Sequence, residues 1–283
     1  MPPDAVASRA SGSLVAEGLA PEAPPRIQIL NGRFDSLTAE ETVEAVVRAI
    51  RAGERGILST VNVAVLMTMR SDPRLQRFVE RSRWTVADGQ PLVWASRLWR
   101  QPLPERVTGI DLIDLLCARA AREGIGVYCL GAEGATVRTV ARVLQERHRG
   151  LALRGCADGY FGPEQAEARA KAVAESGAEL LFVAMGVPRQ ESFIEEQWDR
   201  LGARVVIGVG GSFDVIAGLR KRAPAFLQRA GLEWAYRLAQ EPRRLFRRYL
   251  VTNSRFLGLM SWSVLAQLSP AQIFQARRAA PRP

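Results

Sequence analysis

Short apolar runs alternate with amphipathic stretches along most of the chain. The apolar runs, rich in Val, Ile and Leu, predict strands at 26–30, 57–60, 84–86, 125–130, 151–156, 179–185 and 204–209. The stretches between them carry apolar residues every three to four positions, and they predict helices at 38–53, 91–99, 110–122, 132–147, 163–176 and 190–201, with further helical patterns up to residue 82. Strands that alternate with helices of about 10 to 15 residues predict an α/β fold. We expect a Rossmann-like, largely parallel sheet with helices on both faces.

The pattern changes after residue 219. Pro224 suits the first turn of a helix that runs to about Leu238, where Glu241-Pro242 then breaks the pattern. Residues 256–268 are apolar and uncharged, but this run is shorter than the roughly 20 residues that a bilayer crossing needs. One helical face of this run carries Leu257, Met260, Val264 and Leu268. We expect a helical appendage that lies on a membrane surface, and the alternative is a helix packed on the core or in a subunit contact.

These patterns divide the chain into four parts. Residues 1–25, rich in Pro, Ala, Ser and Gly, predict a disordered leader without a signal-peptide pattern. We expect an α/β catalytic core at 26–219, a helical membrane-associating appendage at 220–268 and a flexible tail at 269–283. Three cysteines and one histidine match neither a disulfide framework nor a zinc site, which indicates a reducing, cytoplasmic compartment.

Positive charge is concentrated at the C-terminal end of the chain. The formal net charge is +10, and residues 220–283 hold 13 of the 39 basic residues but only 2 of the 29 acidic ones. The remainder is therefore close to neutral. A basic, partly apolar appendage predicts peripheral attachment to the anionic inner face of the cell membrane. Nucleic-acid binding is disfavoured, because the appendage lacks a known motif and the aromatic spacing that stacks on bases.

The predicted strands end in glycine, in small polar residues or in acids. These ends are Thr60 to Asn62, Asp88-Gly89, Gly131 to Gly134, Asp158 to Tyr160, Gly186 to Glu191 and Gly208 to Asp214. In a parallel sheet they share one edge, where ligands bind. Glycines beside helix N-termini leave backbone N–H groups free for a phosphate. Ordinary turn and capping chemistry explains each end taken alone, but together they indicate a phosphate-bearing ligand with a ribose or a sugar.

One strand end supports a different class of enzyme. Gly131 and Gly134 form part of a dinucleotide-binding fingerprint, and Asp158 follows at about the distance of a ribose-binding acid. The pattern is incomplete and lies in the middle of the chain. The alternative function is therefore a nicotinamide-dependent oxidoreductase, although Asp158 could equally hold the ribose of a nucleotide sugar.

The motifs occur in an order that resembles a known family. They are Thr60-Val61-Asn62, Ala87-Asp88-Gly89, Glu105-Arg106-Val107-Thr108-Gly109-Ile110-Asp111, Asp158-Gly159-Tyr160-Phe161, Gly186-Val187-Pro188-Arg189-Gln190-Glu191, Gly210-Gly211-Ser212-Phe213-Asp214, Arg222-Ala223-Pro224 and Glu233-Trp234-Ala235-Tyr236-Arg237-Leu238. Their sequence resembles that of the WecG/TagA/CpsF glycosyltransferases from about residue 26 to residue 250. The resemblance implies an inverting transferase that moves a sugar from a nucleoside diphosphate, usually UDP, to a polyprenyl-diphosphate-linked acceptor in surface polysaccharide assembly.

The resemblance also implies roles for individual residues. Asp88 becomes the candidate general base. From the resemblance and the strand ends together, the candidate substrate-binding residues are Thr60, Asn62, Gly89, Arg106, Gly131, Asp158, Gly186, Gln190, Glu191, Gly210, Phe213, Asp214, Arg222 and Arg237. The enzyme would be a hexosyltransferase or an N-acetylhexosaminyltransferase, with a nucleotide sugar, a lipid-linked acceptor and an anionic membrane as partners. A homo-oligomer is possible, and no cofactor is implied.

The residue types suit a metal-independent reaction. A single displacement with inversion needs one base to take the proton of the acceptor hydroxyl, so one carboxylate suffices. The chain contains no Asp-x-Asp pair for a divalent ion, whereas arginines are abundant and their planar guanidinium groups suit phosphate oxygens. We therefore expect Arg106 and Arg237 to stabilise the leaving diphosphate; the alternative for each is a surface salt bridge.

Overall fold

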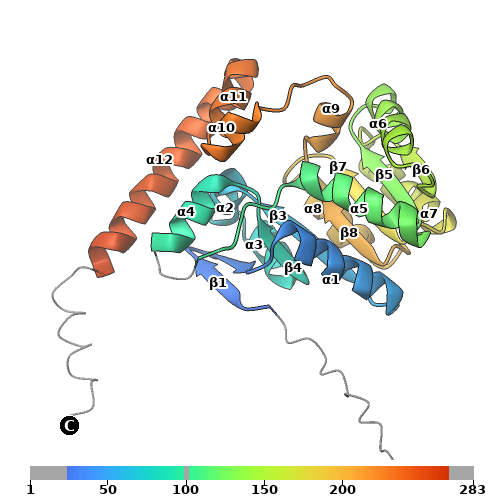
Figure 1. The fold of residues 1–283 in the computed structure, drawn as a ribbon, viewed down its shortest axis with the longest axis horizontal. Coiled ribbons are helices and arrows are strands. Elements are labelled where there is room, and N and C mark those ends of the chain that lie inside the picture. The colour runs from blue at the N-terminus through green and yellow to red at the C-terminus, as the bar shows by residue number, and fades with distance from the viewer. Residues whose placement is uncertain (1–23, 99–101, 268–283) are drawn as a thin grey trace, which may run out of the picture.

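A computed structural model describes residues 24–98 and 102–267. Its centre is a six-stranded parallel sheet in the order β4, β3, β8, β7, β5, β6 (Figure 1). The strands are β3 (Gly56–Val61), β4 (Trp84–Ala87), β5 (Val127–Gly131), β6 (Leu153–Ala157), β7 (Leu180–Ala184) and β8 (Val205–Gly208). Every residue of β4, β5, β7 and β8 is buried, as expected for strands covered on both faces. The predicted fold class is confirmed.

Helices cover the two faces of the sheet and form one apolar core on each side. One core contains residues of α1 (Ala39–Arg51), α5 (Gly109–Glu123), α6 (Gly134–Arg147) and α9 (Ser212–Ile216). The other contains residues of α2 (Val63–Met69), α3 (Pro73–Arg81), α4 (Gln90–Leu98), α7 (Pro163–Glu175) and α8 (Arg189–Gln197). Adjacent strand residues enter opposite cores, as Leu130 and Cys129 do, because side chains alternate along a strand. The predicted helix at 91–99 corresponds to α4, and residue 99 lies outside the described residues.

The first predicted strand lies outside the main sheet. β1 (Arg26–Ile29) pairs with β2 (Gly32–Asp35) in an antiparallel hairpin of its own. Asp35 fixes this hairpin against β4: its carboxylate accepts hydrogen bonds from Thr85 N at 2.7 Å and from Arg26 Nε at 2.9 Å. The apolar pattern at 26–30 thus predicted the strand but not its pairing partner.

The appendage contains three helices where the sequence predicted two. α10 (Ala225–Arg229) and α11 (Glu233–Gln240) replace the single helix predicted to run to about Leu238. They are separated at Gly231, whose φ of 68° lies in the left-handed region that ends a helix. The predicted break at 241–242 is confirmed, because α12 (Pro242–Gln267) begins there. Figure 1 shows α10 to α12 on the side of the molecule opposite to β6 and α7.

α12 packs on the core through a face that includes Met260, one of the residues predicted to meet a membrane. Phe256 and Met260 are buried in the same core as α2. Leu257 is 63% exposed. Met260 therefore does not share a solvent face with Leu257, and Leu268 lies outside the described residues. None of the described helices is both long and apolar enough to span a bilayer. The leader was predicted at residues 1–25, of which only 24 and 25 are described. The predicted flexible tail at 269–283 also lies outside the described residues.

Candidate active site

A cleft of about 230 Å³ lies at the carboxyl ends of β4, β3, β8 and β7 and is bordered by α11. It gathers nine of the residues predicted from the sequence, namely Thr60, Asn62, Asp88, Gly89, Arg106, Gly186, Gln190, Gly210 and Arg237. The last of these comes from the appendage and the others from the core. The core and the appendage therefore form one site.

Asp88 lies at the carboxyl end of β4 and lines the cleft. Its backbone N–H donates to Val61 O at 2.9 Å, which continues the pairing of β4 with β3 by one residue. Loss of hydration raises the pKa of the Asp88 carboxyl to about 7. The positive charges of Arg237 and Arg106 oppose this shift, and the negative charges of Glu233 and Asp111 add to it. A carboxylate with a pKa near neutrality is suited to general-base chemistry.

Two polar side chains at the end of β3 lie beside Asp88. Thr60 Oγ1 donates to Gly208 O at 3.0 Å and so links the ends of β3 and β8. Asn62 caps α2, since its Oδ1 accepts from Val65 N at 3.1 Å. The cap uses only the oxygen of the Asn62 amide, and Asn62 also lines the cleft. Gly89 lies against Asn62, because a Cβ added to Gly89 would sit 3.7 Å from Asn62 Cβ.

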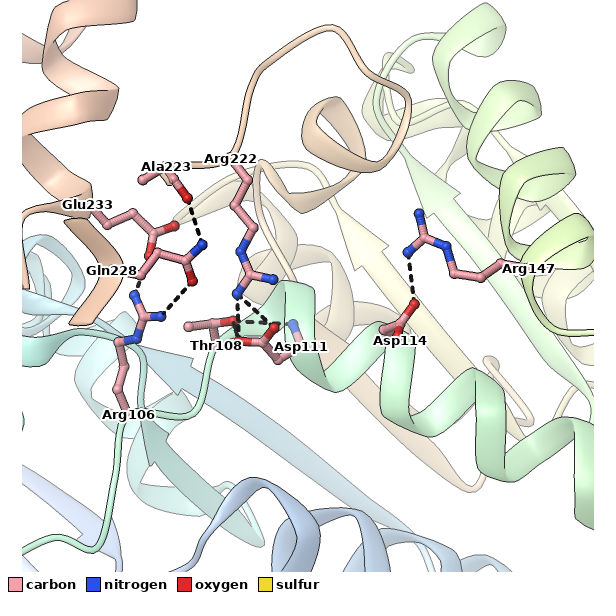
Figure 2. A network of polar contacts seen from close by, with 9 residues as sticks. All are labelled: Arg106, Thr108, Asp111, Asp114, Arg147, Arg222, Ala223, Gln228 and Glu233. Atoms are coloured by element: carbon pink, nitrogen blue, oxygen red, sulfur yellow. Dashed lines mark hydrogen bonds and ion pairs between the residues drawn. The ribbon is translucent and has the colours of Figure 1, made fainter. Parts of the chain in front are cut away.

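Two arginines bring positive charge into the cleft. Arg106 is paired with Glu233 of α11, and its second terminal nitrogen lies 3.4 Å from Gln228 Oε1 (Figure 2). Only 14% of the Arg106 side chain is exposed, so this pair lies inside the cleft rather than on the surface. Arg237 follows Glu233 by one helical turn. No carboxylate within the described part of the chain pairs with its guanidinium, which is therefore available to an anion.

A second ion pair joins the appendage to the core. Arg222 donates to both carboxylate oxygens of Asp111 at 2.7 Å, and Thr108 Oγ1 donates to the same carboxylate (Figure 2). Arg222 thus holds the start of the appendage against the first turn of α5. It does not line the cleft, so the structure does not bring Arg222 together with the other residues predicted to bind substrate.

Two other predicted residues do not line the cleft. Gly131 is the last residue of β5, which neighbours β7. Asp158 follows β6, which is five strands away from β4, a distance of about 24 Å at about 4.8 Å per strand. Asp158 is paired with Arg169 at 2.7 Å. A Cβ added to Gly131 would lie 2.3 Å from Ala184 O, so close strand packing accounts for this glycine. The partial dinucleotide fingerprint is therefore a packing feature in this chain.

The remaining predicted residues are neighbours in sequence of residues that line the cleft, but they do not line it themselves. Glu191 is only 9% exposed and faces a separate small cavity. Phe213 lies on α9 and its side chain is fully buried in the core. Asp214 pairs with Arg220 at 3.0 Å, and Arg220 also pairs with Glu241.

Several cleft residues were not among the predicted ones. The appendage contributes Lys221, Glu233, Trp234 and Gln240 to the lining. The four-residue spacing of Glu233 and Arg237 within the last motif was a usable signal, since it places both on one helical face. The described residues contain no group of three or more His, Cys, Asp or Glu arranged to hold a metal ion.

The comparison with known protein families agrees with this geometry. A model of the glycosyl transferase WecG/TagA/CpsF family matches residues 27–270 of the 283 in the chain. The match includes the hairpin, the sheet with its helices and the appendage through α12. It favours sugar transfer over the oxidoreductase alternative, whose fingerprint lies away from the cleft. The chain belongs to the WecG/TagA/CpsF family of glycosyltransferases.

Proposed function

We propose that the protein transfers a sugar from a nucleoside diphosphate, most simply UDP, to a polyprenyl-diphosphate-linked acceptor during assembly of a cell-surface polysaccharide. The observation that carries this proposal is the placement of Asp88, with a pKa of about 7, in one cleft with Arg106 and Arg237. A base and a cationic subsite are what a single displacement of a diphosphate requires.

The proposed reaction is one in-line displacement. The Asp88 carboxylate takes the proton of the acceptor hydroxyl while that oxygen bonds to the anomeric carbon. The bond from the anomeric carbon to the diphosphate oxygen breaks, and both of its electrons leave with the nucleoside diphosphate. A single displacement inverts the configuration at this carbon. Arg106, Arg237 and Lys221 supply positive charge for the leaving group.

The sugar is proposed to be a hexose or an N-acetylhexosamine. A direct test measures UDP release from a panel of UDP-hexoses and UDP-N-acetylhexosamines, with a polyprenyl-diphosphate-linked sugar as the acceptor. We expect acceptor-dependent UDP release with at least one of these donors. Acceptor-dependent release of a different nucleotide would correct the donor, and failure of transfer from every nucleotide sugar would contradict the proposal.

We expect the reaction to persist in EDTA. Arginine and lysine side chains take the place that a divalent cation would otherwise occupy at the diphosphate. The measurement compares initial rates before and after chelation and after addition of excess Mg²⁺ or Mn²⁺. A loss of activity in EDTA that added metal restores would show that the cationic side chains do not suffice.

Attachment to the inner face of the membrane is proposed through α12. Phe246, Leu250 and Leu257 recur at spacings of four and seven residues, and each is more than half exposed. Arg243 and Arg255 are exposed on the same helix. An exposed apolar stripe on a basic helix is typical of a segment that lies in the headgroup region. The same stripe is also where a homo-oligomer could form.

Changing the three stripe residues together to serine should release the protein from anionic liposomes in a flotation assay. Each apolar side chain contributes burial in the headgroup region, and each nearby arginine adds roughly 1 kcal/mol of attraction that salt screens. The matched control is Leu219→Ser, because Leu219 is 66% exposed but lies outside α12. Flotation of the triple variant at the wild-type level would contradict the membrane role. A change in sedimentation without a change in flotation would assign the stripe to a subunit contact.

A further inference from the structure

Gln190 and Glu191 are adjacent at the start of α8 but face different spaces. The Gln190 side chain lines the cleft and is only 4% exposed. Glu191 faces a cavity of about 10 Å³ on its other side, together with Asp72, Leu75 and Phe78. Glu191 Oε2 has no hydrogen-bond partner among the described residues. Its carboxylate therefore cannot act on a ligand in the cleft directly.

The two side chains form a relay that ends at the cleft. Glu191 Oε1 accepts a hydrogen bond from Gln190 Nε2 at 2.8 Å. Gln190 Oε1 in turn accepts from Gly210 N at 3.1 Å. A Cβ on Gly208 would lie 2.6 Å from Gln190 Nε2, so the amide fits tightly over the end of β8. The order of contacts is thus Glu191, Gln190, Gly210.

The relay depends on the direction of one amide. The side-chain amide of glutamine has an acceptor at one end and donors at the other. If Gln190 turns its oxygen toward Gly210, its nitrogen requires an acceptor on the opposite side, and Glu191 Oε1 supplies it. Without that acceptor, the buried nitrogen would lack a partner and the amide would lose its preferred direction.

Gly210 belongs to the loop that forms one wall of the cleft. Residues 209–212 line it, and Gly210 has a left-handed φ of 51° that favours glycine. A Cβ added to Gly211 would lie 3.9 Å from a terminal nitrogen of Arg237. The loop therefore lies beside the guanidinium that is proposed to hold the diphosphate.

We infer that Glu191 is a positioning residue of the donor site, which orients Gln190 so that the Gly210 loop is held in the shape that receives the nucleoside diphosphate. This inference rests on the proposed function, because it takes the cleft to be the donor site. The relay needs an acceptor oxygen at position 191 but not a negative charge. Burial raises the pKa of the Glu191 carboxyl to about 7, and its Oε1 can accept in either protonation state.

The test measures UDP binding by calorimetry and thermal stability for the wild type, Glu191→Gln, Glu191→Met, Gln190→Met and the double methionine variant. Glu191→Met removes the acceptor and should weaken UDP binding about tenfold, the usual effect of leaving one buried donor unpaired. Glu191→Gln keeps an acceptor oxygen and should bind UDP within about threefold of the wild type. The double variant should bind UDP no more weakly than Gln190→Met, because the relay is already broken.

Stability separates this role from a purely structural one. The double methionine variant leaves neither a buried carboxylate nor an unpaired amide donor, so its melting temperature should lie close to that of the wild type while its UDP affinity falls. Amide hydrogen exchange at Gly210 should become faster in Glu191→Met and in Gln190→Met. If Glu191→Met fails to fold, Gln190→Met still tests the relay through exchange at Gly210 and through UDP affinity.

Three results would overturn the inference. The first is wild-type UDP affinity in Glu191→Met. The second is a loss of UDP affinity in Glu191→Gln as large as that in Glu191→Met, which would show that UDP binding depends on the negative charge of Glu191 and not on its acceptor oxygen. The third is unchanged exchange at Gly210 in Gln190→Met. A wild-type protein that binds no UDP would instead overturn the assignment of UDP as donor nucleotide, and this inference with it.

Discussion

Replacing Asp88 with asparagine should lower the turnover number by about 10²- to 10⁴-fold, the range expected when a general base is lost. Asparagine has nearly the same shape but cannot accept the proton of the acceptor hydroxyl. Asp88 is the predicted acid whose carboxylate lines the cleft with Arg106 and Arg237, so no other predicted residue would substitute for it. The measurement is steady-state UDP release with saturating donor and acceptor.

The same variant should not lose stability. The pKa of Asp88 is raised from 3.8 to about 7 in the folded protein, so the folded state binds the proton more tightly than the unfolded state does. Stability therefore falls as the pH rises from about 4 to about 7. Above pH 7, Asp88→Asn should melt at or above the wild-type temperature. Near-normal turnover in a folded variant would contradict the assignment of the base.

Replacing Arg237 with alanine should lower turnover by about 10²- to 10³-fold, the typical effect of removing one group that stabilises charge in the transition state. Of the positive charges that act on the pKa of Asp88, that of Arg237 has the largest effect, and Arg237 lines the cleft without a carboxylate partner in the described part of the chain. The loss should appear mainly in turnover, because the diphosphate gains charge as the sugar departs. Steady-state UDP release separates this effect from a change in the Michaelis constant.

Arg237→Lys keeps the charge but not the planar guanidinium, and we expect it to recover only part of the rate. Arg243→Ala is the matched control, because Arg243 is exposed on α12 and does not line the cleft. It should leave turnover of a soluble acceptor unchanged. Equal losses in Arg237→Ala and Arg243→Ala would show that the positive charge of the appendage acts as a whole and not at the diphosphate.

The strand ends were predictable from the sequence, but the order of the strands was not. Apolar runs that stop at Asp88 or Asn62 identify the ligand-binding edge of a parallel sheet whatever the order of its strands. Whether two ends are neighbours depends on packing between distant segments. Asp158 follows the same kind of run as Asp88, yet the sheet order places it at the opposite edge. The sequence alone therefore grouped two acids that the structure separates.

For residues that are adjacent to a cleft residue in the sequence, the sequence did not show whether the side chain would face the cleft. Gln190 and Glu191 are adjacent in the same motif, but one lines the cleft and the other is buried behind it. In the first turn of a helix, successive side chains point about 100° apart, so a motif gives no direction until the helix axis is known. Glu233 was missed although its four-residue spacing from Arg237, a predicted residue, places both on one face of α11, and both line the cleft.

The pH dependence of kcat/KM for UDP release tests the central claim most directly. With Asp88 as the general base and a pKa of about 7, kcat/KM should rise with pH to a plateau above about pH 8 and should fall nearly tenfold for each pH unit below about 6. In Asp88→Asn the residual activity should lack this rise. A wild-type profile that is flat from about pH 5.5 to about pH 8.5, or a rise that persists in Asp88→Asn, would contradict the claim that Asp88 is the base.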